Sequence, residues 1–303
     1  MTKFSSTIEI PTDGGRPTVR KLSFYLIPII LFLVTPIALH KVFSGEVIVK
    51  PYIFKIGNFD LRWYAILIVT GFILGARIVY NRAPKYGIKA RDLDHLLIAG
   101  YIAGLVGARL YYVIFNWEYY SKNPFEIIAF WHGGLAIHGV WIGALLTAIV
   151  FSGIKKIPFL KLADLGAIAF PLAQSIGRWG NFFNYEAFGT PTDLPWKLFI
   201  PRAARPAAYK SFSYFHPTFL YESMWNLFIF IYLLQLEKKN PPPGTLFSRY
   251  ILLYSIGRLL IENLRTDSLY LGGVRVAQIV SIIFIGIAIY LEISTKKGLY
   301  GKG

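Results

Sequence analysis

The sequence contains no cysteine in its 303 residues. This absence excludes a disulfide framework, a thiol nucleophile and a thiolate metal site, so any sulfur in the chemistry must come from a substrate. The H-E-x-x-H zinc pattern and the G-x-S-x-G serine elbow are also missing. His132 and His138 are six residues apart, a poor spacing for two ligands on one helix face. We therefore expect neither a metal nor a cofactor.

Charged residues are scarce, at 16%, whereas hydrophobic residues make up 55% and aromatic residues 17% of the chain. This composition excludes an ordinary soluble globular domain. A membrane-spanning helix needs about 20 apolar residues. Eight such helices would use most of the chain and leave no room for a separate soluble domain. The composition predicts one all-α membrane domain.

The charged residues that are present are mostly basic, with a formal net charge of +16. A nucleic-acid-binding protein would cluster its Lys and Arg on a soluble face. Here the basic residues flank apolar segments, a pattern typical of membrane proteins that contact anionic lipid head groups. We expect membrane lipids, and not nucleic acid, as partners.

Apolar segments of spanning length predict a polytopic transmembrane helical bundle with about eight spans. They lie at 22–39, 61–80, 95–115, 133–151, 160–177, 217–236, 246–262 and 274–293. The first could instead be a signal peptide, but it is long, contains two prolines and precedes no clear small-x-small cleavage site. We interpret residues 1–50 as a polar tail with an additional span and residues 51–303 as the main domain. The glycine steps Gly100–Gly104 and Gly139–Gly143 predict close helix packing.

Basic residues set the expected orientation because cytoplasmic connections are enriched in them. They gather in the N-terminal tail, after the second, fourth and sixth spans, and in the C-terminal tail. Both termini are therefore predicted to be cytoplasmic. The external connection at 179–215 breaks this pattern with four basic residues: Lys197, Arg202, Arg205 and Lys210. Long loops are exempt from the bias, and a long loop rich in aromatic residues and arginine is a plausible site element.

With this orientation, most polar residues within the spans lie toward the external side. Tyr254, Arg258, Glu262 and Arg265 form one helical stripe, spaced i, i+4, i+8 and i+11. A charge in a span costs at least about 2.5 to 3.5 kcal/mol, so such residues pair with one another or carry a function. Arg258 and Glu262 alone could be a structural pair. The convergence of many polar residues at one depth favours a functional site. The other polar residues at this depth are Arg62, Tyr64, Arg109, His138, Arg178, His216, Tyr221 and Glu222.

The densest polar segment, residues 177–189, reads GRWGNFFNYEAFG. It resembles the G-R-x-G-N-F-x-N-x-E-x-x-G signature of the bacterial prolipoprotein diacylglyceryl transferases. Residues 62–64 (RWY), 133–139 (GGLAIHG), 216–222 (HPTFLYE) and the final arginine helix resemble other motifs of that family. The resemblance runs in order from about residue 55 to 293. The sequence departs from the family pattern at Ala65 and Val140, where glycine is usual, and in its additional first span.

The resemblance implies transfer of the diacylglyceryl group of phosphatidylglycerol to the lipobox cysteine of a prolipoprotein signal peptide, with release of glycerol phosphate. The absence of cysteine fits, since the thiol would arrive with the substrate. The expected location is the bacterial cytoplasmic (inner) membrane, with the active site toward the outer leaflet. A membrane anion or lipid transporter is the alternative, but such proteins place charges through the midplane and often show internal repeats. A structural or assembly protein is a further alternative.

On this interpretation Arg178 and Arg258 hold the phosphate, because guanidinium groups bind it bidentately. His138 is the candidate base for the thiol proton, since a histidine with its reference pKa of about 6.5 suits that role. Glu186 and Glu262 would orient the arginines. The remaining expected contacts to phosphatidylglycerol are Tyr64, Asn181, Asn184, Gly189, Tyr254 and Arg265.

Overall fold

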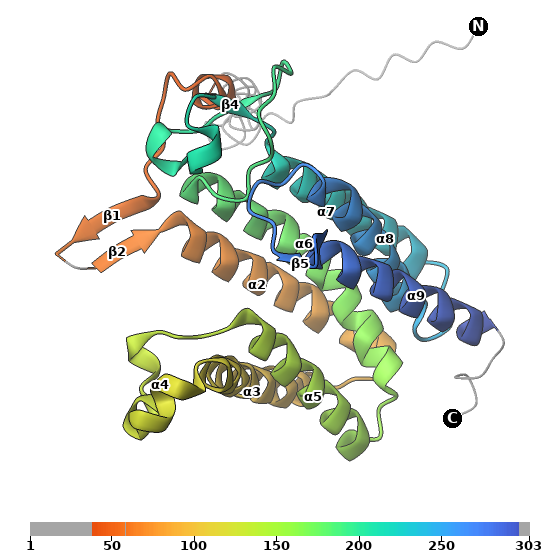
Figure 1. Ribbon diagram of the computed structural model, residues 1–303. Helices are drawn as coiled ribbons and strands as arrows, with labels where there is room; N and C mark the ends of the chain where they lie inside the picture. The colour runs from red at the N-terminus through yellow and green to blue at the C-terminus, as the bar shows by residue number, and fades with distance from the viewer. Residues whose placement is uncertain (1–37, 58, 297–303) are drawn as a thin grey trace, which may run out of the picture. The chain divides into compact units, whose positions relative to one another are not determined.

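The structure is a computed structural model that describes residues 38–57 and 59–296 (Figure 1). The described residues fall into two compact units. The helical unit comprises Pro51–Gly189 and the chain from Thr218 onward. The loop unit comprises residues 38–50 and Thr190–Pro217. Each unit is described below by itself.

Long helices form the helical unit, and each corresponds to one predicted apolar segment (Figure 1). The helices α3 and α6 extend several residues beyond the predicted spans, because their polar ends continue the helix outside the apolar stretch. The bounds are Trp63–Arg82 for α2, Ala90–Phe115 for α3, Ile137–Lys155 for α5, Phe159–Asn184 for α6, Thr218–Glu237 for α7, Thr245–Glu262 for α8 and Val276–Lys296 for α9.

Six helices of the described part of the chain, α2, α3, α5, α6, α7 and α9, are long and apolar enough to cross a membrane. Helix α8 has spanning length but carries three charged residues, Arg249, Arg258 and Glu262, so its assignment as a span remains a prediction. The predicted first span at 22–39 lies almost entirely outside the described residues. The expected fold, a helical bundle that crosses the membrane several times, is confirmed.

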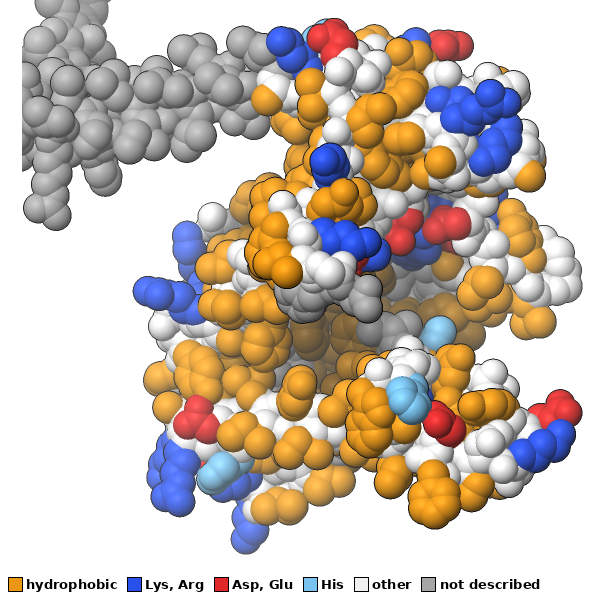
Figure 2. All heavy atoms as spheres, turned by 90° about the vertical axis from the view of Figure 1, so that its left-hand side faces the viewer, with side chains coloured by type: hydrophobic (Ala, Val, Ile, Leu, Met, Phe, Trp, Pro, Cys, Tyr) orange, Lys and Arg blue, Asp and Glu red, His pale blue; other side chains and the backbone are white. Residues whose placement is uncertain are grey.

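The surface agrees with this assignment. Large apolar side chains are exposed along α3, α5 and α9, among them Ile102, Ile114, Leu146 and Ile283. Apolar side chains cover most of the face drawn in Figure 2, and charged side chains gather in small groups between them. Exposed apolar surface on this scale would be unstable in water and is stable against lipid tails.

Small residues allow several helices of the helical unit to pack closely. Helix α2 packs on α6, α3 on α5, α6 on α7, and α8 on α9. A Cβ atom added to Gly139 would lie 2.0 Å from the carbonyl oxygen of Gly107, so these two backbones are almost in contact. A Cβ atom added to Gly71 of α2 would lie 3.0 Å from the carbonyl oxygen of Ala173 in α6. Small residues are common at such contacts between membrane helices.

Short elements complete the two units. The helical unit has a hairpin of β1 (Tyr52–Ile56) and β2 (Phe59–Arg62), a pair of β5 (Tyr270–Leu271) and β6 (Val274–Arg275), and the short helix α4 (Trp117–Lys122). In the loop unit, β3 (Leu198–Phe199) pairs with β4 (Tyr214–Phe215). The ring of Phe199 lies against Gly45, which has a positive φ of 85° and no room for a side chain.

Candidate active site

Glu222 is the centre of a cluster of charged side chains in the helical unit. Its carboxylate lies 2.7 Å from Nε of Arg178, 2.9 Å from a terminal nitrogen of Arg258 and 3.2 Å from a terminal nitrogen of Arg265. The Glu222 side chain is only 4% exposed. A buried carboxylate is costly unless it is paired and hydrogen-bonded. Three guanidinium groups on one carboxylate meet that requirement.

Two further carboxylates balance the remaining positive charge. Arg258 pairs with Glu262 at 2.6 Å, and Arg265 pairs with Asp267 at 2.7 Å. Burial lowers the pKa of the Arg265 guanidinium, but the hydrogen bond to Asp267 and the charge of Glu222 raise it by more. Arg265 therefore keeps its positive charge. The cluster thus contains three arginines and three carboxylates.

Helix ends bring these side chains together. Arg178 lies near the end of α6, Glu222 near the start of α7, and Arg258 near the end of α8. The segment after α6 contacts both α7 and the residues that follow α8. The Thr218 hydroxyl at the start of α7 donates to the carbonyl of Ala187, and Gly189 forms a β-bridge with Arg265. These contacts hold three helix ends at one level.

Gly257 allows α7 and α8 to approach each other next to Arg258. A Cβ atom at this position would lie 2.1 Å from Nε1 of Trp225, whose indole donates to the Leu253 carbonyl at 2.8 Å. No larger residue fits unless the indole moves. The glycine of this motif therefore sets the position of the neighbouring arginine.

The segment after Arg178 presents two amides held by one carboxylate. The side-chain nitrogens of Asn181 and Asn184 donate to Glu186 at 2.9 and 3.3 Å. We predicted that Glu186 orients arginines, whereas in the structure its carboxylate accepts from the two asparagines. Oδ1 of Asn184 is buried and has no hydrogen-bond partner among the described residues. It is an acceptor available to a ligand hydroxyl.

Tyr64 and Tyr254 lie on helices next to the cluster. Gly180 of α6 leaves room for the ring of Tyr64, because a Cβ atom there would lie 2.5 Å from Cδ2 of that ring. Tyr64 is 39% exposed, so its ring is accessible. Tyr254 is one turn before Arg258 on α8 and packs against Tyr250 with ring centroids 5.9 Å apart.

His138 lies in a different part of the helical unit, on α5, which packs against α3. Its exposed ring stacks on Tyr111 of α3 with centroids 5.5 Å apart. Within the described residues, no hydrogen bond or ion pair links His138 to Glu222 or its arginines. The structure therefore does not join the predicted base to the predicted phosphate site through direct contacts.

The loop before His138 is organised by Arg109, which is 2% exposed. Its guanidinium donates to the backbone carbonyls of Glu126, Ile127, Ala129, Gly133 and Gly134. In the same loop His132 lies 2.8 Å from the Glu126 carboxylate. Arg109 thus has a structural role: it holds the connection between α3 and α5.

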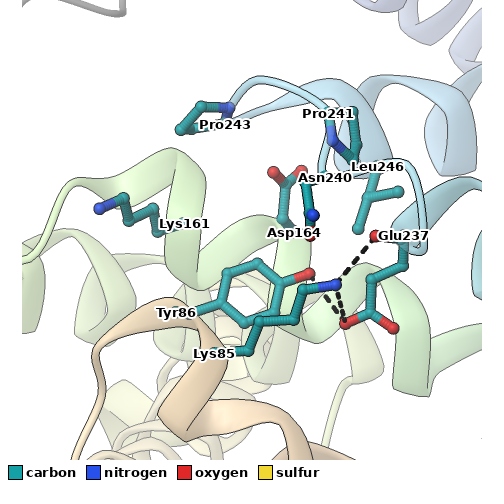
Figure 3. A pocket seen from close by; sticks show the side chains of 9 residues that line it. All are labelled: Lys85, Tyr86, Lys161, Asp164, Glu237, Asn240, Pro241, Pro243 and Leu246. Atoms are coloured by element: carbon teal, nitrogen blue, oxygen red, sulfur yellow. Dashed lines mark hydrogen bonds and ion pairs between the residues drawn. The ribbon is translucent and has the colours of Figure 1, made fainter.

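A second group of charges lies at the opposite ends of α2, α6 and α7 (Figure 3). Glu237 accepts from Nε of Arg82 at 2.9 Å, and its backbone carbonyl accepts from Lys85 at 2.9 Å. Asp164 accepts from the backbone N–H groups of Gly244 and Phe247 at the start of α8. Lys85, Asp164 and Glu237 are among the residues that line a cavity of about 180 Å³. Their contacts connect helix ends to loops, which indicates a structural role.

Sequence reasoning named Glu222 as part of the polar set but gave it no role in the site. The available signal was a carboxylate near the start of α7 among mostly apolar residues, since such a carboxylate needs a cation as partner. Its three arginine partners depend on how α6, α7 and α8 are rotated about their axes, and apolar periodicity does not specify that rotation. Among the described residues, no group of three or more His, Asp or Glu side chains could hold a metal ion.

Comparison with known proteins gives the family. The model of the family described as prolipoprotein diacylglyceryl transferase matches residues 51–294. A Fervidobacterium nodosum protein named phosphatidylglycerol–prolipoprotein diacylglyceryl transferase is 52% identical over 264 residues, 86% of this chain and 90% of its own length. Proteins of the same name from Thermotoga petrophila (49% identical; 84% of this chain, 88% of theirs) and Acaryochloris marina (53% identical; 78% and 87%) are similar. The chain therefore belongs to the prolipoprotein diacylglyceryl transferase family.

Proposed function

We propose that this protein transfers the diacylglyceryl group of phosphatidylglycerol to the thiol of a lipobox cysteine in a prolipoprotein signal peptide. Its relatives carry the name of this activity, and the chain covers most of their length. The observation that carries the proposal for this chain is the cluster of Arg178, Arg258 and Arg265 around the buried carboxylate of Glu222. A phosphodiester is the anionic group of the lipid that would meet such a cluster.

Of the three arginines, Arg178 has the guanidinium group best placed to bind the phosphate. Its closest approach to Glu222 is through Nε, at 2.7 Å, and within the described residues its two terminal nitrogens make no hydrogen bond. Those two nitrogens form the fork that binds phosphate oxygens bidentately. Arg258 uses one terminal nitrogen for Glu222 and the other for Glu262, so it holds the cluster together and adds positive charge.

The polar groups beside Arg178 suit the glycerol head group. The amide nitrogens of Asn181 and Asn184 are held by Glu186, which leaves the amide oxygens as acceptors. The Asn184 oxygen has no partner of its own. A head-group hydroxyl would satisfy it. The lipid would also contact the accessible Tyr64 ring, Gly189 and Tyr254. Arg265 and Glu262 would hold the charged groups around it in place.

The reaction is a displacement at carbon. The thiolate sulfur attacks the terminal glyceryl carbon of the diacylglyceryl group and forms a thioether. The carbon–oxygen bond to the phosphate breaks, and glycerol 1-phosphate leaves with that oxygen. The arginines offset the negative charge on the leaving phosphate, an electrostatic contribution that is often the largest in catalysis. His138 takes the thiol proton, and its exposed ring is accessible to a substrate.

The proposed site faces the outer leaflet of the bacterial inner membrane. The connections at the helix ends opposite the arginine cluster are rich in basic residues. Two of these residues form ion pairs there, Arg82 with Glu237 and Lys155 with Asp92. Basic connections are typical of the cytoplasmic side. Both termini are assigned to that side.

Release of the head group tests the proposal. Purified protein is incubated with phosphatidylglycerol labelled in its head group and a synthetic lipobox peptide. We expect labelled glycerol phosphate only when the peptide contains its cysteine, and none with a cysteine-to-serine peptide. Release of glycerol phosphate that is independent of the cysteine would indicate a C-type phospholipase instead, and movement of intact lipid across vesicles without release would indicate a transporter.

A further inference from the structure

Four basic residues in the external connection, Lys197, Arg202, Arg205 and Lys210, are not used by the proposed site. The sequence from Leu194 to Tyr221 contains no acidic residue at all. The positive-inside bias does not explain this excess, because long loops are exempt from it. This segment therefore needs its own physical explanation.

Two of the four basic residues stabilise the loop unit. Arg205 is 8% exposed, donates to the carbonyls of Ile200 and Lys210, and lies over the Phe199 ring at 5.6 Å. Lys197 lies over the Tyr214 ring at 4.5 Å and pairs with Asp193 at 3.5 Å. Their charges are explained by the fold of the unit.

The other two basic residues are exposed and adjacent. Nζ of Lys210 donates to the backbone carbonyl of Arg202 at 2.9 Å, which fixes the two residues side by side. Phe212 follows on the same turn, because its N–H donates to the carbonyl of Tyr209, and it is 49% exposed. We call this surface the basic patch and define it by its residues: Arg202, Ala203, Ala204, Ala207, Ala208, Lys210 and Phe212, all exposed.

Exposed cations beside an exposed aromatic ring are the chemistry of a protein surface that rests on anionic lipid. The chain enters this connection shortly after α6 ends at Asn184 and leaves it where α7 begins at Thr218. It therefore joins two membrane-spanning helices where the chain leaves the bilayer. We infer that the basic patch binds the anionic lipid surface of the outer leaflet, with Arg202 and Lys210 on head-group phosphates and Phe212 in the interfacial layer.

This inference rests on the proposed function for the orientation in the membrane and for the identity of the lipid, phosphatidylglycerol, which would be both surface and substrate. The patch would raise the local concentration of phosphatidylglycerol near the enzyme without taking part in the reaction. Its loss should therefore change the dependence of the rate on lipid content and leave the maximal rate unchanged.

The test uses the full chain, whose lack of cysteine allows a single label. A polarity-sensitive fluorophore is attached to Phe212→Cys, and the protein is placed in nanodiscs of phosphatidylcholine with or without phosphatidylglycerol. We expect a blue shift that requires phosphatidylglycerol, weakens at high salt, and is suppressed by Arg202→Glu or Lys210→Glu. A label that does not respond to phosphatidylglycerol, or that responds only when the lipobox peptide is added, would overturn the inference.

Kinetics provide the second measurement. Arg202→Glu and Lys210→Glu should each raise KM, measured as the mole fraction of phosphatidylglycerol, roughly fivefold with kcat unchanged. Lys122→Glu is the matched control, since this external lysine is 72% exposed and lies outside the loop unit. Equal effects of all three changes, or a fall in kcat alone, would contradict the inference. The fluorescence needs no turnover, so an inactive protein that still shows the shift would contradict only the proposed function.

Discussion

Glu222 brings together arginines from three parts of the sequence, and its charge is the property that matters most at this position. Glu222→Gln keeps the shape of the side chain but leaves three partly buried guanidinium groups with one fewer counter-charge. Breaking a buried ion pair typically costs about 3–5 kcal/mol. We expect a clear loss of thermal stability and a fall in turnover of roughly 100-fold or more.

Thermal unfolding and head-group release measure these two effects. Glu118→Gln is the control, because the Glu118 side chain is 92% exposed. Glu222→Gln with normal stability and normal turnover would show that the cluster does not depend on its central carboxylate.

Arg258 bridges two carboxylates with two different nitrogens, at 2.9 Å to Glu222 and 2.6 Å to Glu262. A lysine has one nitrogen and cannot reproduce that geometry. Arg258→Lys should therefore reduce kcat roughly 100-fold although the charge is kept. Arg62→Lys, at an arginine that is 54% exposed, should have little effect. Wild-type kcat in Arg258→Lys would refute the bridging role.

His138 has an accessible ring stacked on Tyr111, and its proposed role is proton transfer. His138→Gln should lower the rate at neutral pH by about 100-fold. Part of the rate should return at higher pH, because a free cysteine thiol ionises by itself with a pKa of about 8.5. Tyr111→Phe keeps the ring and should keep the wild-type pH profile. An unchanged pH profile in His138→Gln would exclude His138 as the base.

At the scale of single residues, the sequence predicted the arginines of the cluster better than their partners. Arg178, Arg258 and Arg265 meet as expected, because charges in an apolar bundle must converge. Glu186 was expected to orient arginines, and in the structure its carboxylate accepts from Asn181 and Asn184. Local turn geometry after α6 decides that contact, and the spacing of residues along a helix does not reveal it.

At the scale of elements, the start of α8 depends on a side chain from α6. The Asp164 carboxylate accepts from the backbone N–H groups of Gly244 at 2.6 Å and Phe247 at 2.8 Å, which caps the first turn. Asp164→Asn leaves one oxygen for two donors. We expect a loss of about 1–2 kcal/mol of stability and faster amide exchange in the first turn of α8. Asp193→Asn, at a fully exposed carboxylate, is the control. Unchanged exchange would mean that the cap contributes nothing.

The long helices could be predicted because each contains a long apolar stretch, whereas close contacts between them were predicted only in part. Gly139 and Gly143 do approach α3, at Gly107 and Ala103. Gly100 has no neighbour that a side chain would meet. A small residue permits a close approach but does not specify which helix makes it. The loop unit has no apolar periodicity, so its small β-pair could not be predicted.

At the scale of the whole molecule, the charges favour an enzyme at one membrane surface over a transporter. The three-arginine cluster lies at one set of helix ends, and the contacts of Arg82, Lys85 and Asp164 lie at the other. A transport pathway would be expected to have polar groups near the middle of the bilayer. Composition and motifs were sufficient to predict the membrane bundle and the family.

The most direct test of the account is the mass of the acceptor peptide. Membranes containing this protein are incubated with phosphatidylglycerol and a lipobox peptide, and the peptide is then analysed by mass spectrometry. The account predicts a gain equal to one diacylglyceryl group, which disappears when serine replaces the cysteine. No gain from folded protein, with a known family member active in parallel, would contradict the account and indicate a lipid-binding or transport protein.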